Sequence, residues 1–181
     1  MLLRKIRSKV VYKNPWFQVR EDIIFWPDKK RSTYSFVERS NVNFIIAQDE
    51  QKSIFFVEEY RYPVKKSILQ LPAGVTDKKE KDLSAAKREL LEETGLKANE
   101  WKKIGQFFIG PGHENIRANV FWAKNINVSQ PGKSRNNKER EFIFNIRKIP
   151  IKKIKGLIKA DKIECGITLA ALNIFFTKIQ I

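Results

Sequence analysis

The chain has 181 residues, enough for one domain with a sizeable core or for a domain plus a small extra layer. Its 36 Lys and Arg against 20 Asp and Glu give a formal net charge of +16, which would attract nucleic acid, an anionic membrane or a phosphorylated small molecule. No apolar run approaches the ~20 residues of a membrane span, and the start lacks a secretory apolar region, so we expect a soluble cytoplasmic protein.

The first forty residues predict a small antiparallel β-layer. Strands are expected at residues 9–12, 17–25 and 32–39, and Pro27 and Asp28 mark a turn between the last two. Residues 1–39 are therefore separated from a second unit, residues 40–181.

The second unit alternates β and α segments. The expected strands are 41–47, 53–59, 101–109, 116–123 and 142–146. The expected helices are 82–94, 151–158 and 163–178, and a long polar loop is expected at 125–138. This alternation predicts an α/β sandwich around a mixed sheet. The single cysteine, Cys165, lies in an apolar run and is expected to be a small buried hydrophobe rather than a nucleophile.

Three carboxylates share one stripe of the helix at 82–94. With Asp82 as its cap, Glu89, Glu92 and Glu93 fall at i, i+3 and i+4, within about 100° of arc. Their repulsion needs a compensating cation or Arg88, which reaches Glu92 one turn on. Hard oxygen ligands of this kind suit Mg²⁺ or Mn²⁺. The alternative is a solvated Glu-rich helix.

The neighbouring arc of this helix is apolar. It carries Leu83, Ala86 and Leu90, which would seat the helix on a sheet and leave the acids facing a cleft. Gly95 is expected to end the helix in the left-handed conformation, with Leu96 making the hydrophobic contact that follows.

The segment around the helix fits a longer pattern. Residues 74–96 match G-x5-E-x7-R-E-U-x-E-E-x-G-U, where U is aliphatic, at every specified position. This pattern resembles the signature of the Nudix hydrolases. Residues 57–64 (VEEYRYPV) and 71–74 (LPAG), together with Pro111, 15 residues beyond Leu96, resemble the ADP-ribose pyrophosphatase branch.

The resemblance covers about residues 10–176, with an acidic loop at 138–142 and a terminal helix at 162–172. It implies a Nudix-type α/β/α sandwich around a mixed sheet, with the small N-terminal antiparallel β-layer as a dimerisation element. It also implies that water cleaves a phosphoanhydride with the help of metal ions.

The resemblance assigns metal ligands on and near the helix. Glu89 and Glu93 would bind Mg²⁺, or Mn²⁺ in its place, helped by Glu92 and the backbone carbonyl of Ala73. Glu80 would support a metal or the loop. Arg88 would orient one of the helix carboxylates. The alternative for the same contact is an ordinary salt bridge within the helix.

The catalytic base is expected in the acidic loop. We place Glu141 ahead of Glu139, although each also reads as a solvated loop charge. Arg61 is expected to grip phosphate oxygens, with an ion pair to Glu58 or Glu59 as the alternative.

Substrate residues other than Arg61 are expected to be mostly aromatic. Phe17, Trp26 or Tyr60 would offer a π surface to adenine, unless they belong to the core or a dimer interface. Pro111, the marker of the branch, is placed with them.

Two positions depart from the branch. Gln70 stands where the branch has Glu, and His113 to Ile116 replace its usual sequence after Pro111-Gly112. They put the sugar specificity in doubt and leave ADP-ribose as the leading substrate. His113 is expected near the phosphates or as a loop residue with a local hydrogen bond.

The expected function is metal-dependent hydrolysis of ADP-ribose or a related nucleoside diphosphate derivative, giving AMP and ribose 5-phosphate from ADP-ribose. The alternatives are hydrolysis of NADH, dinucleoside polyphosphates or capped RNA, and a catalytically idle fold that binds a nucleotide or RNA. A homodimer is expected, because the short strands of residues 1–39 cannot bury all their aromatic side chains. The basic charge is spread along the chain without an RNA-binding fingerprint, so a nucleic-acid partner is not favoured.

Overall fold

A computed structural model describes residues 3–128 and 143–179. The chain splits into two compact units, residues 1–41 with 107–117, and residues 42–106 with 118–181. The division into 1–39 and 40–181 stays a prediction from the sequence. Glu139, Glu141 and most of the predicted polar loop lie outside the described residues.

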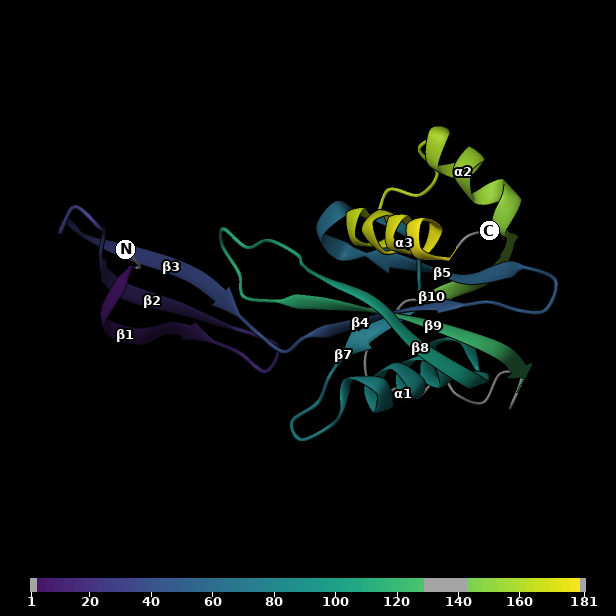
Figure 1. The fold of residues 1–181 in the computed structure, drawn as a ribbon, viewed down its shortest axis with the longest axis horizontal. Helices are drawn as coiled ribbons and strands as arrows, with labels where there is room; N and C mark the ends of the chain where they lie inside the picture. The colour runs from purple at the N-terminus through teal and green to yellow at the C-terminus, as the bar shows by residue number, and fades with distance from the viewer. Residues whose placement is uncertain (1–2, 129–142, 180–181) are drawn as a thin grey trace. The chain divides into compact units, whose positions relative to one another are not determined.

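The first unit is built on an antiparallel sheet, drawn in purple and blue in Figure 1. Its order is β1 (Arg4–Lys13), β2 (Gln18–Phe25) and β3 (Arg31–Glu38). β1 is longer than predicted, because basic residues interrupt its apolar ones and mask the strand pattern. Its pairing with β2 has two register irregularities. Arg20 of β2 pairs with Glu38 of β3 at 2.9 Å, and a hydrogen bond from Gln18 holds the pKa of Glu38 below its usual value.

The second unit contains two sheets (Figure 1). The antiparallel sheet has the order β10 (Ile143–Pro150), β5 (Ser53–Arg61) and β6 (Lys66–Gln70). The other has the order β7 (Ala73–Val75), β4 (Val42–Ala47), β9 (Arg117–Val128) and β8 (Leu96–Phe108). β4 and β9 run parallel, so this second sheet is mixed, as the sequence predicts.

Some strand predictions are wrong in their bounds. β6 and β7 were not predicted, because each is short and β7 contains Gly74. Residues 125–128 continue β9 rather than opening the polar loop. β8 begins at Leu96, directly after the first helix, rather than at residue 101. The early start has no clear strand pattern in the sequence, because several of these residues are polar and face solvent.

Helices cover both faces of the mixed sheet. α1 (Asp82–Thr94) packs on β4 and β7, whereas α3 (Gly166–Lys178) packs on β4 from the opposite side (Figure 1). α2 (Ile151–Lys159) packs on β10. This arrangement is the predicted α/β/α sandwich. None of the helices in residues 3–128 and 143–179 combines the length and the apolar character that a membrane crossing needs.

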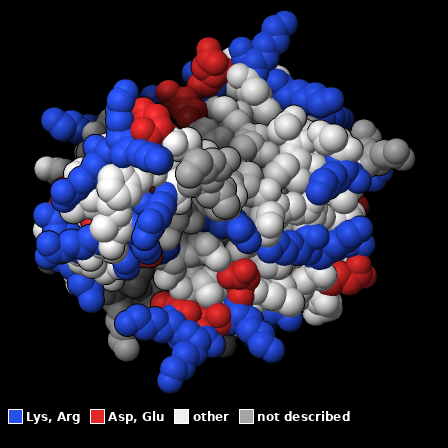
Figure 2. Space-filling model, turned by 60° about the vertical axis from the view of Figure 1, so that its left-hand side comes forward, with Lys and Arg blue, Asp and Glu red and all other residues white. Residues whose placement is uncertain are grey.

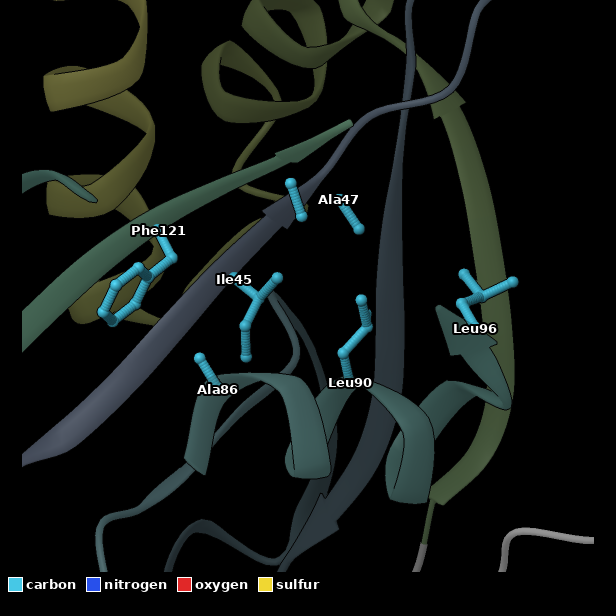
Figure 3. Packing of buried hydrophobic residues seen from close by; sticks show 7 residues of the cluster. Ile45, Ala47, Ala86, Leu90, Leu96 and Phe121 are labelled. Atoms are coloured by element: carbon cyan, nitrogen blue, oxygen red, sulfur yellow. The ribbon is translucent and has the colours of Figure 1, made fainter. Parts of the chain in front are cut away.

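One apolar cluster seats α1 on the sheet. Ala86 and Leu90 of α1 face Ile45 and Ala47 of β4 and Phe121 of β9, as Figure 3 shows. Ala86 and Leu90 are fully buried, so replacing Leu90 by Ala would destabilise the fold by about 2–5 kcal/mol. Leu96 of β8 closes the cluster after Gly95, whose φ of 69° confirms the predicted left-handed helix end.

The buried arc of α1 differs from the predicted one. Leu83 is 38% exposed, and Ala85 is fully buried instead. Glu89 and Glu93 are also buried, at 8% and 4% exposure, so the acids lie on the buried arc rather than beside it. The prediction that the acids face a cleft stays a prediction.

Basic side chains are widely distributed. Figure 2 shows Lys and Arg spread across one face of the molecule, with Asp and Glu gathered at fewer places. The general solubility and steering role of the net charge stays a prediction. Cys165 is half-buried rather than fully buried.

Candidate functional site

Arg88 is the centre of an acidic cluster on α1. Its guanidinium donates to Glu80 (3.0 Å), Glu89 (2.8 Å) and Glu92 (3.0 Å), and also to the carbonyl of Val75 (3.1 Å). The predicted i,i+4 contact to Glu92 is confirmed. The hydrogen bond to Glu80, followed by the other acids, raises the pKa of Arg88 above its usual value. The same bond lowers the pKa of Glu80.

Glu93 contacts the first residue of β7. Its carboxylate accepts a hydrogen bond from the backbone N–H of Ala73 at 3.0 Å, and the side chain is almost fully buried. The two residues predicted to share a metal ion, Glu93 and Ala73, therefore lie in direct contact.

Gly74 permits the close approach of Glu89. A Cβ atom placed on Gly74 would lie 1.8 Å from Cδ of Glu89, a distance that no side chain can accept. Only glycine fits at this point while Glu89 keeps its position. The first residue of the predicted signature is therefore required by packing against the acid that follows it 15 positions later.

A polar chain fixes the loop between β7 and α1. Asp82 does not cap the helix, because Lys81 occupies the cap position without a side-chain hydrogen bond. Instead the Asp82 carboxylate accepts a hydrogen bond from Thr76 Oγ1 (2.8 Å), which in turn accepts one from Asn43 Nδ2 (2.9 Å). Asn43 lies on β4 and accepts a bond from Asn119 of β9. Asn43, Thr76 and Asn119 carry no signal in the sequence, since they are far apart along the chain and only the folded sheet joins them.

The donor set fits a hard divalent cation by its chemistry. Glu80, Glu89 and Glu92 converge on one cationic group, Arg88, and Glu93 lies one turn from Glu89. Nevertheless, among residues 3–128 and 143–179 no three acidic, histidine or cysteine side chains are already arranged as a metal site. A divalent ion would therefore compete with Arg88 for these carboxylates.

Arg61 lies at the end of β5 and is held by two neighbours. Its Nη1 contacts Glu59 Oε1 at 2.8 Å, and its Nε donates to Gln70 Oε1 at 3.3 Å. The ion pair with Glu59, the alternative considered for Arg61, is thus present. Glu58 pairs with Arg147 instead, at 3.0 Å. Tyr60, the next residue on β5, is half-buried.

The remaining predicted substrate residues belong to the first unit. Phe17 is half-buried, and the centroids of its ring and the Tyr12 ring lie 5.7 Å apart. Trp26 is 42% exposed, and its indole N–H donates to the Ser32 hydroxyl. Pro111 is exposed in the segment between β8 and β9. His113 is exposed as well, and its backbone carbonyl accepts a hydrogen bond from the N–H of Val37 on β3, far away in the sequence; the role of its side chain stays a prediction.

Comparison with known proteins identifies related sequences and folds. The family model described as "NUDIX domain" matches residues 37–163, and one described as "Nucleoside diphosphate sugar hydrolase N-terminal domain" matches residues 4–37. The chain is 28% identical over 147 residues to the ADP-ribose pyrophosphatase of Bacillus subtilis, covering 81% of this chain and 78% of the relative. It is 30% identical over 122 residues to the ADP-ribose pyrophosphatase of Mycobacterium tuberculosis, covering 67% and 59%.

A solved structure confirms the predicted fold. The structure titled "Crystal structure of ADP compounds hydrolase" superposes with a TM-score of 0.81 and 18% sequence identity, over 98% of this chain and 94% of that chain. At this identity the likeness concerns the architecture alone, which is the α/β sandwich with an added N-terminal sheet.

Proposed function

This chain belongs to the Nudix family of hydrolases, and we propose that it hydrolyses the pyrophosphate bond of a nucleoside diphosphate sugar, with ADP-ribose as the leading substrate. The observation that carries the proposal is the set of carboxylates on and beside α1, held together by Arg88. The match of residues 4–37 supports the substrate class, and the names of two relatives support ADP-ribose.

The α1 acids would hold the metal in this proposal. Glu89 and Glu93 would be the main ligands of Mg²⁺ or Mn²⁺, helped by Glu92 and the carbonyl of Ala73, while Glu80 supports the loop. Such an ion would neutralise pyrophosphate charge and acidify the attacking water. Arg88 orients the carboxylates, since it already contacts three of them.

Side chains of this protein would bind the substrate phosphate and accept the proton of the attacking water. Arg61 binds a phosphate through its guanidinium, and Glu141, or Glu139 in its place, accepts the proton of the attacking water. The water oxygen joins one phosphorus as the bond from the bridging oxygen to that phosphorus breaks. Two monophosphates leave, which are AMP and ribose 5-phosphate when the substrate is ADP-ribose.

The adenine contact is assigned to aromatic side chains. Tyr60, Phe17 and Trp26 offer π surfaces, and Pro111 offers an exposed apolar ring. These four residues complete the proposed substrate set with Arg61.

We also propose a homodimer that uses the first unit. Trp16, Trp26 and Phe25 are 77%, 42% and 36% exposed. β1 and the residue before it add a further set of exposed apolar residues: Leu3, Ile6, Val10, Val11 and Tyr12. A symmetric dimer would cover this apolar surface.

A substrate screen tests the proposed function. Purified protein with Mg²⁺ is incubated with nucleotide sugars, NADH, dinucleoside polyphosphates and capped RNA, and released phosphomonoester is measured. We expect ADP-ribose to give the highest kcat/KM. Preference for capped RNA or a dinucleotide would contradict the substrate assignment, and no Mg²⁺-dependent release from any compound would contradict the reaction.

A further inference from the structure

We propose that Glu59 and Gln70 are positioning residues, which fix the Arg61 guanidinium for a phosphate group and keep the charge of this group of three at zero. The inference rests on the proposed function, in which Arg61 binds a phosphate of the substrate. It names two residues that act through Arg61 and do not touch the substrate themselves.

The strand geometry brings the three side chains together. Glu59 and Arg61 are two residues apart on β5, so they point to the same face of the sheet. On β6, Ile68 is the register partner of Glu59, which places Gln70 diagonally next to Glu59 on that face. The contacts form a closed ring, because Gln70 Nε2 also donates to Glu59 Oε2 at 2.8 Å.

Burial separates the ring into a fixed side and an open side. Glu59 and Gln70 are 6% and 4% exposed, whereas the Arg61 side chain is 47% exposed. Nε and Nη1 of Arg61 are engaged by the two buried neighbours. A guanidinium has five N–H donors, so several others remain on the half-exposed side to contact an anion. The orientation that phosphate binding needs is thus set before the substrate arrives.

The backbone links this ring to the α1 acids. Leu71, which follows Gln70, donates its N–H to the buried Thr168 Oγ1 at 3.1 Å, and the Pro72 carbonyl accepts from Ile45 at 2.9 Å. Ala73, which contacts Glu93, comes next. A short segment with both ends fixed therefore joins the phosphate-binding arginine to the proposed metal ligands.

The amide at position 70 is matched to the carboxylate at position 59. Gln70 donates to Glu59 and accepts from Arg61, a combination that a carboxylate at position 70 cannot make. Glu at position 70 would place two buried carboxylates within hydrogen-bond distance and change the group from neutral to negative. Both effects oppose the binding of a pyrophosphate.

A charge-swap series tests the inference. Steady-state hydrolysis of ADP-ribose with Mg²⁺ gives KM and kcat for wild type, Q70E and the double variant E59Q/Q70E, and calorimetry in EDTA gives the Kd for ADP-ribose. We expect Q70E to raise KM and Kd about tenfold with kcat within about threefold of wild type. In the double variant the amide at position 59 donates to the carboxylate at position 70, and both side chains still accept from Arg61. KM should therefore return to within about threefold of wild type.

E58Q is the matched control. Glu58 neighbours Glu59 but points to the other face of β5, where it pairs with Arg147, so KM should not change. A folded Q70E with wild-type KM, or a double variant no better than Q70E, would overturn the inference while leaving the proposed function intact. If Q70E fails to fold, the double variant alone decides. A wild type that hydrolyses no compound of the screen overturns the proposed function instead.

Discussion

Replacing Arg88 by Met should destabilise the protein mainly through the acids that it holds together. Arg88 donates to three carboxylates and one carbonyl, and its side chain is 31% exposed. At about 0.5–1 kcal/mol for each partly exposed charged contact, four partners give about 3 kcal/mol. For a chain of this size that loss lowers Tm by about 6–12 °C.

The loss should depend on pH and on Mg²⁺. The pKa of Glu80 is lowered in the folded protein, chiefly by its hydrogen bond to Arg88, so this contact stabilises the fold above the unfolded pKa of about 4.3. The stabilisation disappears as the pH falls through the lowered folded pKa, and the difference between wild type and Arg88→Met should shrink there. Mg²⁺ should stabilise the variant more than wild type, because the ion no longer competes with Arg88.

Urea unfolding at pH 7 and at pH 3, with and without Mg²⁺, measures these effects. Lys87→Met is the control, since Lys87 is the exposed neighbour on α1 and its loss should change stability by less than about 0.5 kcal/mol. If Arg88→Met loses no more stability at pH 7 than Lys87→Met, or loses as much at pH 3 as at pH 7, the assignment of Arg88 as the electrostatic centre is wrong.

Four further predictions address the reaction and the assembly. Glu93→Gln should lower turnover at least about 10²-fold with little change in Tm, because Gln can still accept from Ala73 N–H; near-normal turnover at saturating Mg²⁺ would reject the metal assignment. Gly74→Ala should lower turnover about tenfold by displacing Glu89, whereas Gly156→Ala, with open space around its Cβ, should not; equal rates for the two would refute the packing requirement. Glu141→Gln should reduce turnover and leave Mg²⁺ affinity intact, and the same result for Glu139→Gln alone would reverse their order. Deletion of residues 1–39 should abolish dimerisation and substrate affinity together while Mg²⁺ binding survives, and light scattering of a fully active monomer at micromolar concentration would contradict this.

Local sequence patterns predicted α1 well. Its last residue, its glycine stop and the Arg88–Glu92 contact all follow from spacing within one helix, and all three are found. The predicted cap is wrong, because the Asp82 carboxylate accepts a hydrogen bond from Thr76, which lies outside the helix, instead of capping the helix. Burial of Glu89 and Glu93 was also missed, since charged residues are assigned to the surface unless a partner is known.

Contacts between strands could not be predicted from the sequence. The ring of Glu59, Arg61 and Gln70 depends on the register of β5 with β6, and β6 itself was not expected. The sequence marked Gln70 as a departure from its family pattern, whereas the structure gives it two hydrogen-bonding partners. Similarly, Asn43 and Thr76 lie on separate elements that only the folded sheet brings together.

Hydrolysis of ADP-ribose in ¹⁸O-labelled water tests the central claim most directly. With wild-type protein and Mg²⁺, mass spectrometry should find AMP and ribose 5-phosphate in equal amounts, with a single ¹⁸O in one of the two products, and Glu93→Gln should form neither at a comparable rate. Absence of both products from a folded protein with Mg²⁺, or undiminished formation by Glu93→Gln, would contradict the assignment of the α1 carboxylates to a metal-dependent pyrophosphatase.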